Sequence, residues 1–433
     1  MTAEPHVLPR DQFLALARGG GGIDAIGNLV AAEHSRHMIL VRGVFNAARA
    51  GEGPDDQLAV AGYEALAQAQ RRDPDAASAV IRYPSVGAWA LHTLRRDNSI
   101  PGARPGGLAS VAAAAAIRAG ISTEIEVPVR DGKVVLPSLG VADVQGDTAV
   151  VRTSPAEVRS GTRRMRLAPG TPGWQDLRRI RAGSLDVIID DLDPFRIPTA
   201  DGEPLSRLSR SQVADLERAL SDAWEVLDPA RAAEIAALVR VIVPCQGPVQ
   251  GYVSTSSRET FGTIAMSQPP DPYSGAETLV HEAQHLKLGA VADLVRLTLP
   301  DDEPRYYAPW RDDLRPASAL LQGTYAFFGV CGFWRWQRQA VADDAVRRRA
   351  DAEFVQWREG CAAAADTLLT SGQLTAAGQD FVGEIAGLLD AWRQEKVSMG
   401  AQSVARRKSD LRAAKSRAQN GDGSASATPG LAG

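Results

Sequence analysis

The stretch AETLVHEAQHLKLGAVADLVRL, residues 276–297, decides how the rest of the chain can be interpreted. Its apolar residues, Leu279 and Leu286 among them, recur at helical spacing, so the pattern predicts a helix over the whole range. Just before it, Ser274 followed three positions later by Glu277 forms a capping-box pattern, which predicts where the helix begins.

Within this helix the run HEAQH places His281 and His285 four residues apart. An α-helix rises about 1.5 Å and turns about 100° per residue, so both imidazoles leave one face and can share a cation. Glu282 then lies beside the metal, where a carboxylate can take a proton from bound water or act as a further ligand. We therefore expect His281 and His285 to be metal ligands and Glu282 to be catalytic.

A third metal ligand is not decided by the sequence. No His follows His285, which excludes the long HExxHxxGxxH pattern, and residues 316–340 contain no Asp or Glu. Asp293 lies about 12 Å along the same helix and cannot reach the same ion. The remaining candidates are acidic or amide residues nearby in the chain: Glu259, Glu282, Asp301, Asp302, Glu303, Asp312, Asp313 and Gln322.

The composition is that of an ordinary globular protein. The chain has 433 residues, 44% of them hydrophobic, and its formal charge of −4 gives no basic surface for nucleic acid or an anionic membrane. The cysteines Cys245, Cys331 and Cys361 are far apart and unpaired in pattern, so we expect buried thiols and a cytoplasmic protein. No stretch predicts a signal peptide or a membrane span.

The order of local patterns predicts an α+β fold that is mainly helical. We expect a helical N-terminal region (1–120), a β-rich insert or layer (121–204), a helical domain carrying the HExxH helix (205–415) and a disordered tail (416–433). Gly19 to Gly22 should break the first helix, and Asp131-Gly132 should form a hairpin turn.

Several other residues have a plain structural interpretation. His34 and His37, three apart, are expected on a solvated helix face, and His92 on a helix surface or in packing. Tyr325 and Trp310 are polar-tipped aromatics that could line a pocket, although Tyr325 has the helical spacing of a core residue.

Four segments together carry a family resemblance. These segments are FLALARGGGGIDAIGNLVAAEHSRHMILV (13–41), SSRETFGTIAMS (256–267), ETLVHEAQHLKLGAVADL (277–294) and YAPWRDDLRPASALLQGTYAFFGVCGFW (307–334). They resemble the HExxH-motif proteins of ribosomal peptide natural-product clusters, which are 2-oxoglutarate-dependent peptide β-hydroxylases. The resemblance spans most of the chain except the β-rich middle and the tail.

The resemblance implies an Fe(II) enzyme that uses O2 and 2-oxoglutarate to hydroxylate a side-chain β-carbon, typically of Asp, in a ribosomally made precursor peptide. His281 and His285 match the metal ligands of that family, and Glu282 matches its acidic position. A 2-oxoglutarate co-substrate needs a cation for its distal carboxylate, and a guanidinium can bind a carboxylate through two hydrogen bonds. Arg258, Arg311 and Arg315 are the candidates, although each could equally form a structural ion pair.

Two functions other than the iron oxygenase fit the same residues. Two His with a carboxylate and open positions suit non-haem iron, but two His, Glu and water suit a zinc peptidase that processes a precursor peptide. The other alternative is a protein that binds the peptide by strand addition without catalysis. The oligomeric state is open.

Overall fold

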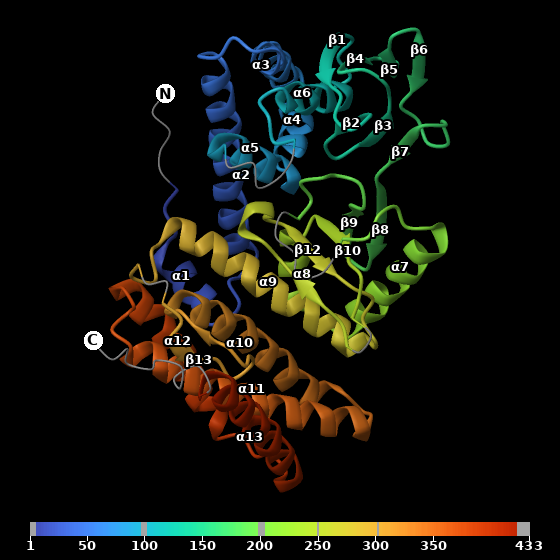
Figure 1. The fold of residues 1–433 in the computed structure, drawn as a ribbon. Coiled ribbons are helices and arrows are strands. Elements are labelled where there is room, and N and C mark those ends of the chain that lie inside the picture. Colours follow the sequence, from blue (N-terminus) through green and yellow to red (C-terminus); the bar gives the residue numbers. More distant parts are fainter. Residues whose placement is uncertain (1–5, 97–101, 198–203, 249–250, 301–302, 422–433) are drawn as a thin grey trace, which may run out of the picture. The chain divides into compact units, whose positions relative to one another are not determined.

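The structure is a computed structural model that describes residues 6–96, 102–197, 204–248, 251–300 and 303–421 (Figure 1). Its secondary structure is 57% helix and 15% strand, which confirms the expected α+β, mainly helical class. The chain divides into two compact units. The motif unit comprises residues 1–29, 226–237 and 276–433, and the sheet unit comprises 30–225 and 238–275.

Helices of different lengths and three sheets build the described part of the sheet unit. The Ala-rich helix α6 (Gly107–Arg118) packs closely against α3 (Pro54–Arg72). A Cβ added at Gly62 of α3 would come within 2.7 Å of the Ala109 backbone of α6. Small side chains at this contact are therefore required. The helices that lie in this unit or extend into it are α2 (Gly22–Ala48), α3 (Pro54–Arg72), α4 (Pro74–Ile81), α5 (Pro84–Arg95), α6 (Gly107–Arg118) and α7 (Arg210–Glu225).

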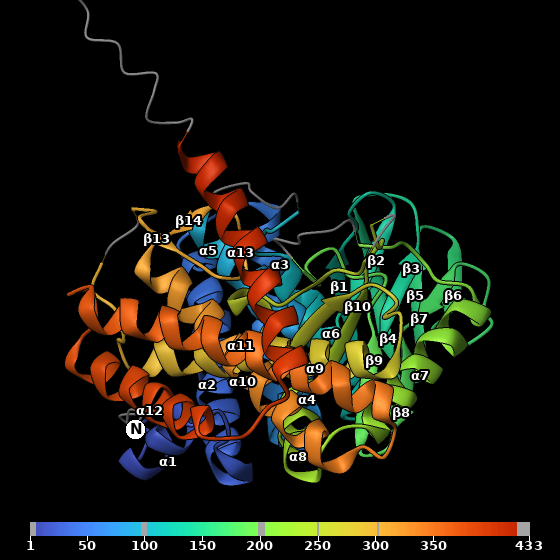
Figure 2. The ribbon, with the colours of Figure 1, turned by 90° about the horizontal axis from the view of Figure 1, so that it is seen from below.

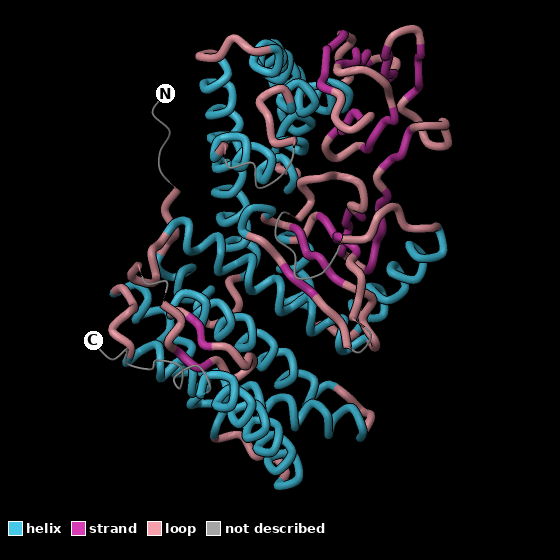
Figure 3. Tube along the Cα trace, in the orientation of Figure 1, coloured by secondary structure: helices cyan, strands magenta, loops and turns pink. Residues whose placement is uncertain are grey.

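The strands of the sheet unit form two antiparallel sheets and one mixed sheet (Figure 3). The first has the order β1-β4-β5-β6, the second β2-β3-β7, and the mixed sheet β11-β12-β10-β9-β8, in which β9, β10 and β12 are parallel. Their bounds are β1 (Glu124–Pro128), β2 (Lys133–Leu136), β3 (Gly140–Asp143), β4 (Thr148–Thr153), β5 (Ala156–Ser160), β6 (Arg163–Arg166), β7 (Trp174–Asp176), β8 (Arg178–Ala182), β9 (Leu185–Ile189), β10 (Val241–Pro244), β11 (Ser254–Thr255) and β12 (Thr263–Met266).

The predicted hairpin turn is confirmed, because Asp131 and Gly132 both have positive φ, 51° and 71°, as a tight hairpin turn requires. In the run SRETFGTIAMS only the second half is a strand, β12. Arg258–Thr260 forms a single 3-10 turn, η1, which begins where the Ser257 side chain accepts a hydrogen bond from the Glu259 amide.

Long helices dominate the motif unit. Helix α11 packs against α10, α12 and α13, and α10 buries Phe328, Phe333 and Trp334 (Figure 2). The elements are α1 (Arg10–Ala17), α8 (Pro229–Leu238), α9 (Pro272–Leu294), β13 (Tyr306–Tyr307), β14 (Leu314–Arg315), α10 (Ala317–Ala340), α11 (Asp344–Thr370), α12 (Ala376–Arg393) and α13 (Met399–Gly421). Since α13 is helical up to Gly421, the expected tail from residue 416 is wrong for its first part, and the rest lies outside the described residues.

The HExxH helix α9 begins one turn earlier than the capping-box pattern predicts. Asp271 caps it, because its Oδ1 accepts the Ser274 amide at 3.0 Å and its Oδ2 accepts the Ser274 hydroxyl at 2.7 Å. Pro272 at the first helical position needs no amide partner, which permits this earlier start. Glu277 accepts a hydrogen bond from the Trp334 indole at 3.0 Å instead of closing a capping box.

A buried ion pair fixes α9 to the start of the chain. The Lys287 ammonium lies 3.0 Å from the Glu234 carboxylate and donates to the carbonyl oxygens of Gly19, at 2.8 Å, and Gly20, at 3.2 Å. The expected helix break at Gly19 to Gly22 is confirmed, with Gly19 at φ +87°. Because only this turn exposes both carbonyl groups, the glycines give Lys287 its partners.

Removing one partner of this buried pair should destabilise the protein strongly. We expect Glu234→Gln to lower the free energy of unfolding by about 3 kcal/mol, since it leaves a buried ammonium without a counter-charge. Asp380→Asn, in the exposed pair of Arg10 and Asp380, is the control and should cost less than about 1 kcal/mol. Urea unfolding monitored by circular dichroism measures both. Equal losses for the two variants would contradict this assignment.

Candidate metal centre

The two motif imidazoles meet at their Nε2 atoms. His281 and His285 leave α9 one turn apart, with ring centroids 4.7 Å apart and ring planes inclined at 77°. Their Nε2 atoms are separated by 3.1 Å. Two ligands at Zn–N or similar distances on a tetrahedral ion would lie about 3.3 Å apart, so the pair fits a shared cation with little movement.

Gln322 of α10 orients the second imidazole. Its Oε1 lies 3.2 Å from Nδ1 of His285, so the amide oxygen accepts the Nδ1 hydrogen. A neutral imidazole with hydrogen on Nδ1 has its lone pair on Nε2, the atom that faces His281. Histidine ligands of metals commonly donate their other ring N–H in this way. Gln322 was a candidate third ligand, but here it supports the ring from the far side.

His281 is held in the neutral form. Burial lowers its pKa well below the usual value, and the nearby His285 lowers the pKa further. The edge of the His281 ring contacts Phe327 at a centroid distance of 4.7 Å. A neutral imidazole is the form that binds a metal, so the surroundings prepare this residue for coordination.

An aromatic cluster flanks the imidazoles. Phe327 stacks on Trp357 with centroids 4.2 Å apart and lies 5.0 Å from Trp310. A Cβ at Gly323 would come within 2.5 Å of the Trp310 indole, so a glycine is needed for this approach. Phe327 and Trp310 remain partly exposed. Part of each ring is therefore accessible close to the imidazoles; the sequence suggested a pocket-lining position for Trp310 but not for Phe327.

Tyr325, in contrast, belongs to the core. It is 1% exposed, and its hydroxyl donates to the Leu16 carbonyl oxygen at 2.5 Å. The core interpretation made from helical spacing is confirmed.

The candidate third ligands mostly have other partners. In the sheet unit Glu259 accepts from His92 at 2.8 Å and pairs with Arg95, and these bonds lower its carboxyl pKa despite the opposing effect of burial. In the motif unit Glu303 pairs with Arg305 at 3.0 Å. Asp301 and Asp302 lie outside the described residues. Among the residues that the structure describes, no cluster of three His, Cys, Asp or Glu could hold a metal.

Glu282 is the carboxylate nearest in sequence to the imidazoles, and it is only 2% exposed. Its position on the same helical turn keeps it among the residues that can support the centre, either as a proton acceptor or as a ligand.

The expected co-substrate arginines fall into two groups. Arg311 and Arg315 both bind Asp313, at 2.8 and 3.1 Å, and the bond from Arg311 is the main cause of a lowered pKa for Asp313. All three side chains are about one-third to one-half exposed. Arg258 lies in the sheet unit, where its carbonyl oxygen accepts from Arg36 at 3.1 Å.

The expectation of a solvated face for His34 and His37 is wrong. His37 is 2% exposed, and its Nδ1 lies 2.8 Å from the Ile81 carbonyl oxygen. Burial lowers its pKa to about 4. His34 lies 3.2 Å from the Ser78 hydroxyl. The face of α2 that carries them is covered by residues that follow α3, which the local sequence could not reveal.

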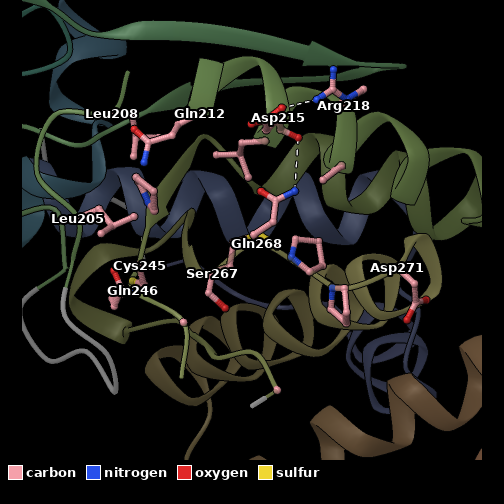
Figure 4. Close-up of a pocket in the computed structure, with 18 of the residues that line it drawn as sticks. Leu205, Leu208, Gln212, Asp215, Arg218, Cys245, Gln246, Ser267, Gln268 and Asp271 are labelled. Atoms are coloured by element: carbon pink, nitrogen blue, oxygen red, sulfur yellow. Dashed lines mark hydrogen bonds and ion pairs between the residues drawn. The ribbon is translucent and has the colours of Figure 1, made fainter. Parts of the chain in front are cut away.

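A large hollow of about 780 Å3 lies in the sheet unit (Figure 4). It opens where β10 and β12 end, beside α7, the edge at which parallel strands often bind ligands. Among its charged groups, Arg218 pairs with Asp215, and the Gln268 amide donates to the backbone carbonyl oxygen of Asp215 at 3.5 Å. Its titratable lining residues are Asp215, Asp222, Asp271, Arg218 and Cys245.

Comparison of the chain with protein-family models gives no match, and comparison with curated proteins gives no match either. In the described part of the chain, no helix combines the length and apolar character needed to cross a bilayer. Function is therefore inferred from the site, because a fold by itself does not imply one.

Loss of the Gln322 amide should weaken metal binding without removing a ligand. We expect Gln322→Leu to lower the affinity for Fe(II), and for Co(II) as a spectroscopic probe, about 10- to 100-fold. Gln379→Leu, at an exposed glutamine of α12, is the control and should leave affinity unchanged. Anaerobic titration followed by absorption measures both. Unchanged affinity in Gln322→Leu would mean that the amide does not orient a ligand.

Proposed function

We propose that the protein is a non-haem Fe(II), 2-oxoglutarate-dependent oxygenase that hydroxylates a side-chain β-carbon, that of Asp by the family resemblance, in a ribosomally made precursor peptide. The observation that carries this proposal is the 3.1 Å approach of the two Nε2 atoms on one helical turn. Two imidazoles and one carboxylate, for which buried Glu282 is a candidate, would leave positions of an iron ion free for co-substrate and O2, as in facial-site oxygenases.

The residues of the chain have separate tasks in this proposal. His281 and His285 would hold the metal, and Gln322 would keep the His285 lone pair directed at it. Bound Fe(II) would supply the redox chemistry that O2 activation needs. Phe327 and Trp310 shield the substrate from water, and buried Glu282 holds a proton or completes the ligand set.

We assign the distal carboxylate of 2-oxoglutarate to an arginine. Arg311 and Arg315 present two guanidinium groups to one carboxylate, that of Asp313, which supports their assignment as carboxylate-binding residues. A co-substrate would have to compete with Asp313 for them. Arg258 remains the alternative.

We further propose a cytoplasmic location. Cys245, Cys331 and Cys361 are buried and free, and burial raises the pKa of the Cys245 thiol to about 11. Thiols of this kind are unreactive and suit a reducing compartment.

Incubation of the protein with an Asp-containing precursor peptide, Fe(II), 2-oxoglutarate and O2 should give succinate and a peptide heavier by one oxygen atom, both measured by mass spectrometry. We expect His281→Ala and His285→Ala to lose at least about 1,000-fold in rate, because each removes a protein ligand of the reacting metal. The exposed-site variant Asp380→Asn should keep full activity.

A zinc peptidase is the competing function, because Glu282 beside a bound Zn2+ could accept a proton from water. Cleavage of the peptide without O2 that stops with a chelator, together with no succinate, would replace the oxygenase proposal with this one.

A further inference from the structure

A second, smaller cavity in the sheet unit has the features of a binding site for a small molecule. It encloses about 230 Å3 between α5, α6, the Asp131 hairpin and the loop after β9. At about 30 Å3 per water it would hold roughly eight waters, which is the size of one ring with a short substituent. Its walls are mainly apolar and are formed by Val86, Trp89, Val111, Val135 and Phe195.

One end of this cavity is polar. The Ser85 hydroxyl donates to Asp193 Oδ2 at 2.7 Å, and the Phe195 amide donates to Asp193 Oδ1 at 2.8 Å. Ser85 is 2% and Asp193 3% exposed, so the protein positions a largely buried carboxyl group at the wall of the cavity. Apolar walls with a few convergent polar groups are typical of ligand sites.

The carboxyl group of Asp193 lies close to a second buried carboxyl group, that of Asp190. Asp190 accepts from Tyr83 at 2.6 Å and from the Asp193 amide at 2.9 Å, and the guanidinium of Arg196 donates to the Asp193 carbonyl oxygen rather than to its carboxylate. Burial, and after it the negative Asp190, raise the pKa of Asp193 to about 7. A positive charge on a ligand, in addition to that of Arg196, would stabilise the ionised form of Asp193.

The opening is close to neutral. Arg130 pairs with Asp55, and Lys133 and Asp131 carry opposite charges beside it. Because the opening has no strong positive charge, it does not repel a cationic ligand.

We propose that this cavity binds a small molecule that has an apolar body about one ring in size and a protonated amino group facing the Asp193 carboxylate. Contact with Val86, Trp89 and Phe195 would hold the body, and the ammonium group would donate to Asp193. The site lies wholly in the sheet unit, so the proposal does not depend on the metal centre.

Three probes of similar shape test the charge requirement: 2-phenylethylamine, 2-phenylethanol and 3-phenylpropionate, each titrated into the full chain by calorimetry or ligand-observed NMR. We expect the amine to bind at least about 10-fold more tightly than the alcohol and the carboxylate to bind weakest. Similar affinities for the three probes, or no binding of the amine at millimolar concentration, would overturn the proposal.

Variants of the cavity separate a specific site from general attraction. We expect Asp193→Asn to remove the preference for the amine, because the amide has no charge; its oxygen can still accept from the Phe195 amide, and its NH2 group can donate to the Ser85 hydroxyl oxygen instead of accepting from it. Asp131→Asn, which removes an exposed carboxylate at the opening, is the matched control and should change affinity less than about 2-fold. Val135→Trp should fill the cavity and abolish binding of the amine and the alcohol, with an unchanged circular dichroism spectrum. Amine preference that survives Asp193→Asn would assign it to another carboxylate and refute the site.

The pH dependence provides an independent readout. The charged and titratable groups around Asp193 are Tyr83, Asp190 and Arg196, together with Arg130, Asp131 and Lys133 at the opening. A primary amine stays protonated near neutral pH, as lysine does, so binding requires ionised Asp193. Because the Asp193 pKa is about 7, amine affinity should fall up to tenfold per unit below pH 7 and level off above it. A flat profile from pH 5.5 to 8 would contradict the role of Asp193.

Discussion

The candidate metal centre depends on a helix that cannot shift along its axis. His281 and His285 face one point only while α9 stays regular and fixed, and the buried ion pair of Lys287 and Glu234 supplies that restraint. The same ammonium group binds the carbonyl groups of the glycine turn near the chain start. Since a buried ammonium is costly unless all its partners are present, a displaced α9 would leave it unsatisfied. The geometry of the motif is thus coupled to residues far away in sequence.

Features that arise from local periodicity could be predicted from the sequence. The fold class, the helical ends, the glycine break and the Asp131 hairpin follow from spacing and backbone preference, and the pairing of His281 with His285 follows from one helical turn. The start of α9 could not be predicted from the capping box, because Asp271 and Pro272 compete for the same function one turn earlier. Two caps were compatible with the local sequence, and tertiary packing of Glu277 against Trp334 selected one.

The surroundings of the centre were harder to predict because they depend on contacts between distant segments. Gln322 and Phe327 lie on α10, and no spacing rule indicates which of its faces meets the imidazoles. The burial of His37 and the pairing of Glu259 with His92 have the same origin. A polar residue in a sequence window has many possible partners, and only the folded chain decides among them.

Burial has opposite chemical effects at the two sites, and this difference explains why each suits its proposed ligand. At His281 the loss of water disfavours the imidazolium ion, which leaves a neutral nitrogen lone pair that a metal cation can use. At Asp193 the same loss disfavours the carboxylate, which leaves a group that gains stability when a cation approaches. Burial therefore favours the neutral form of both groups: a metal cation would use the neutral His281 lone pair, whereas an ammonium group would stabilise the ionised Asp193 carboxylate. The two proposals thus share a positively charged ligand, a metal ion at one site and an ammonium group at the other.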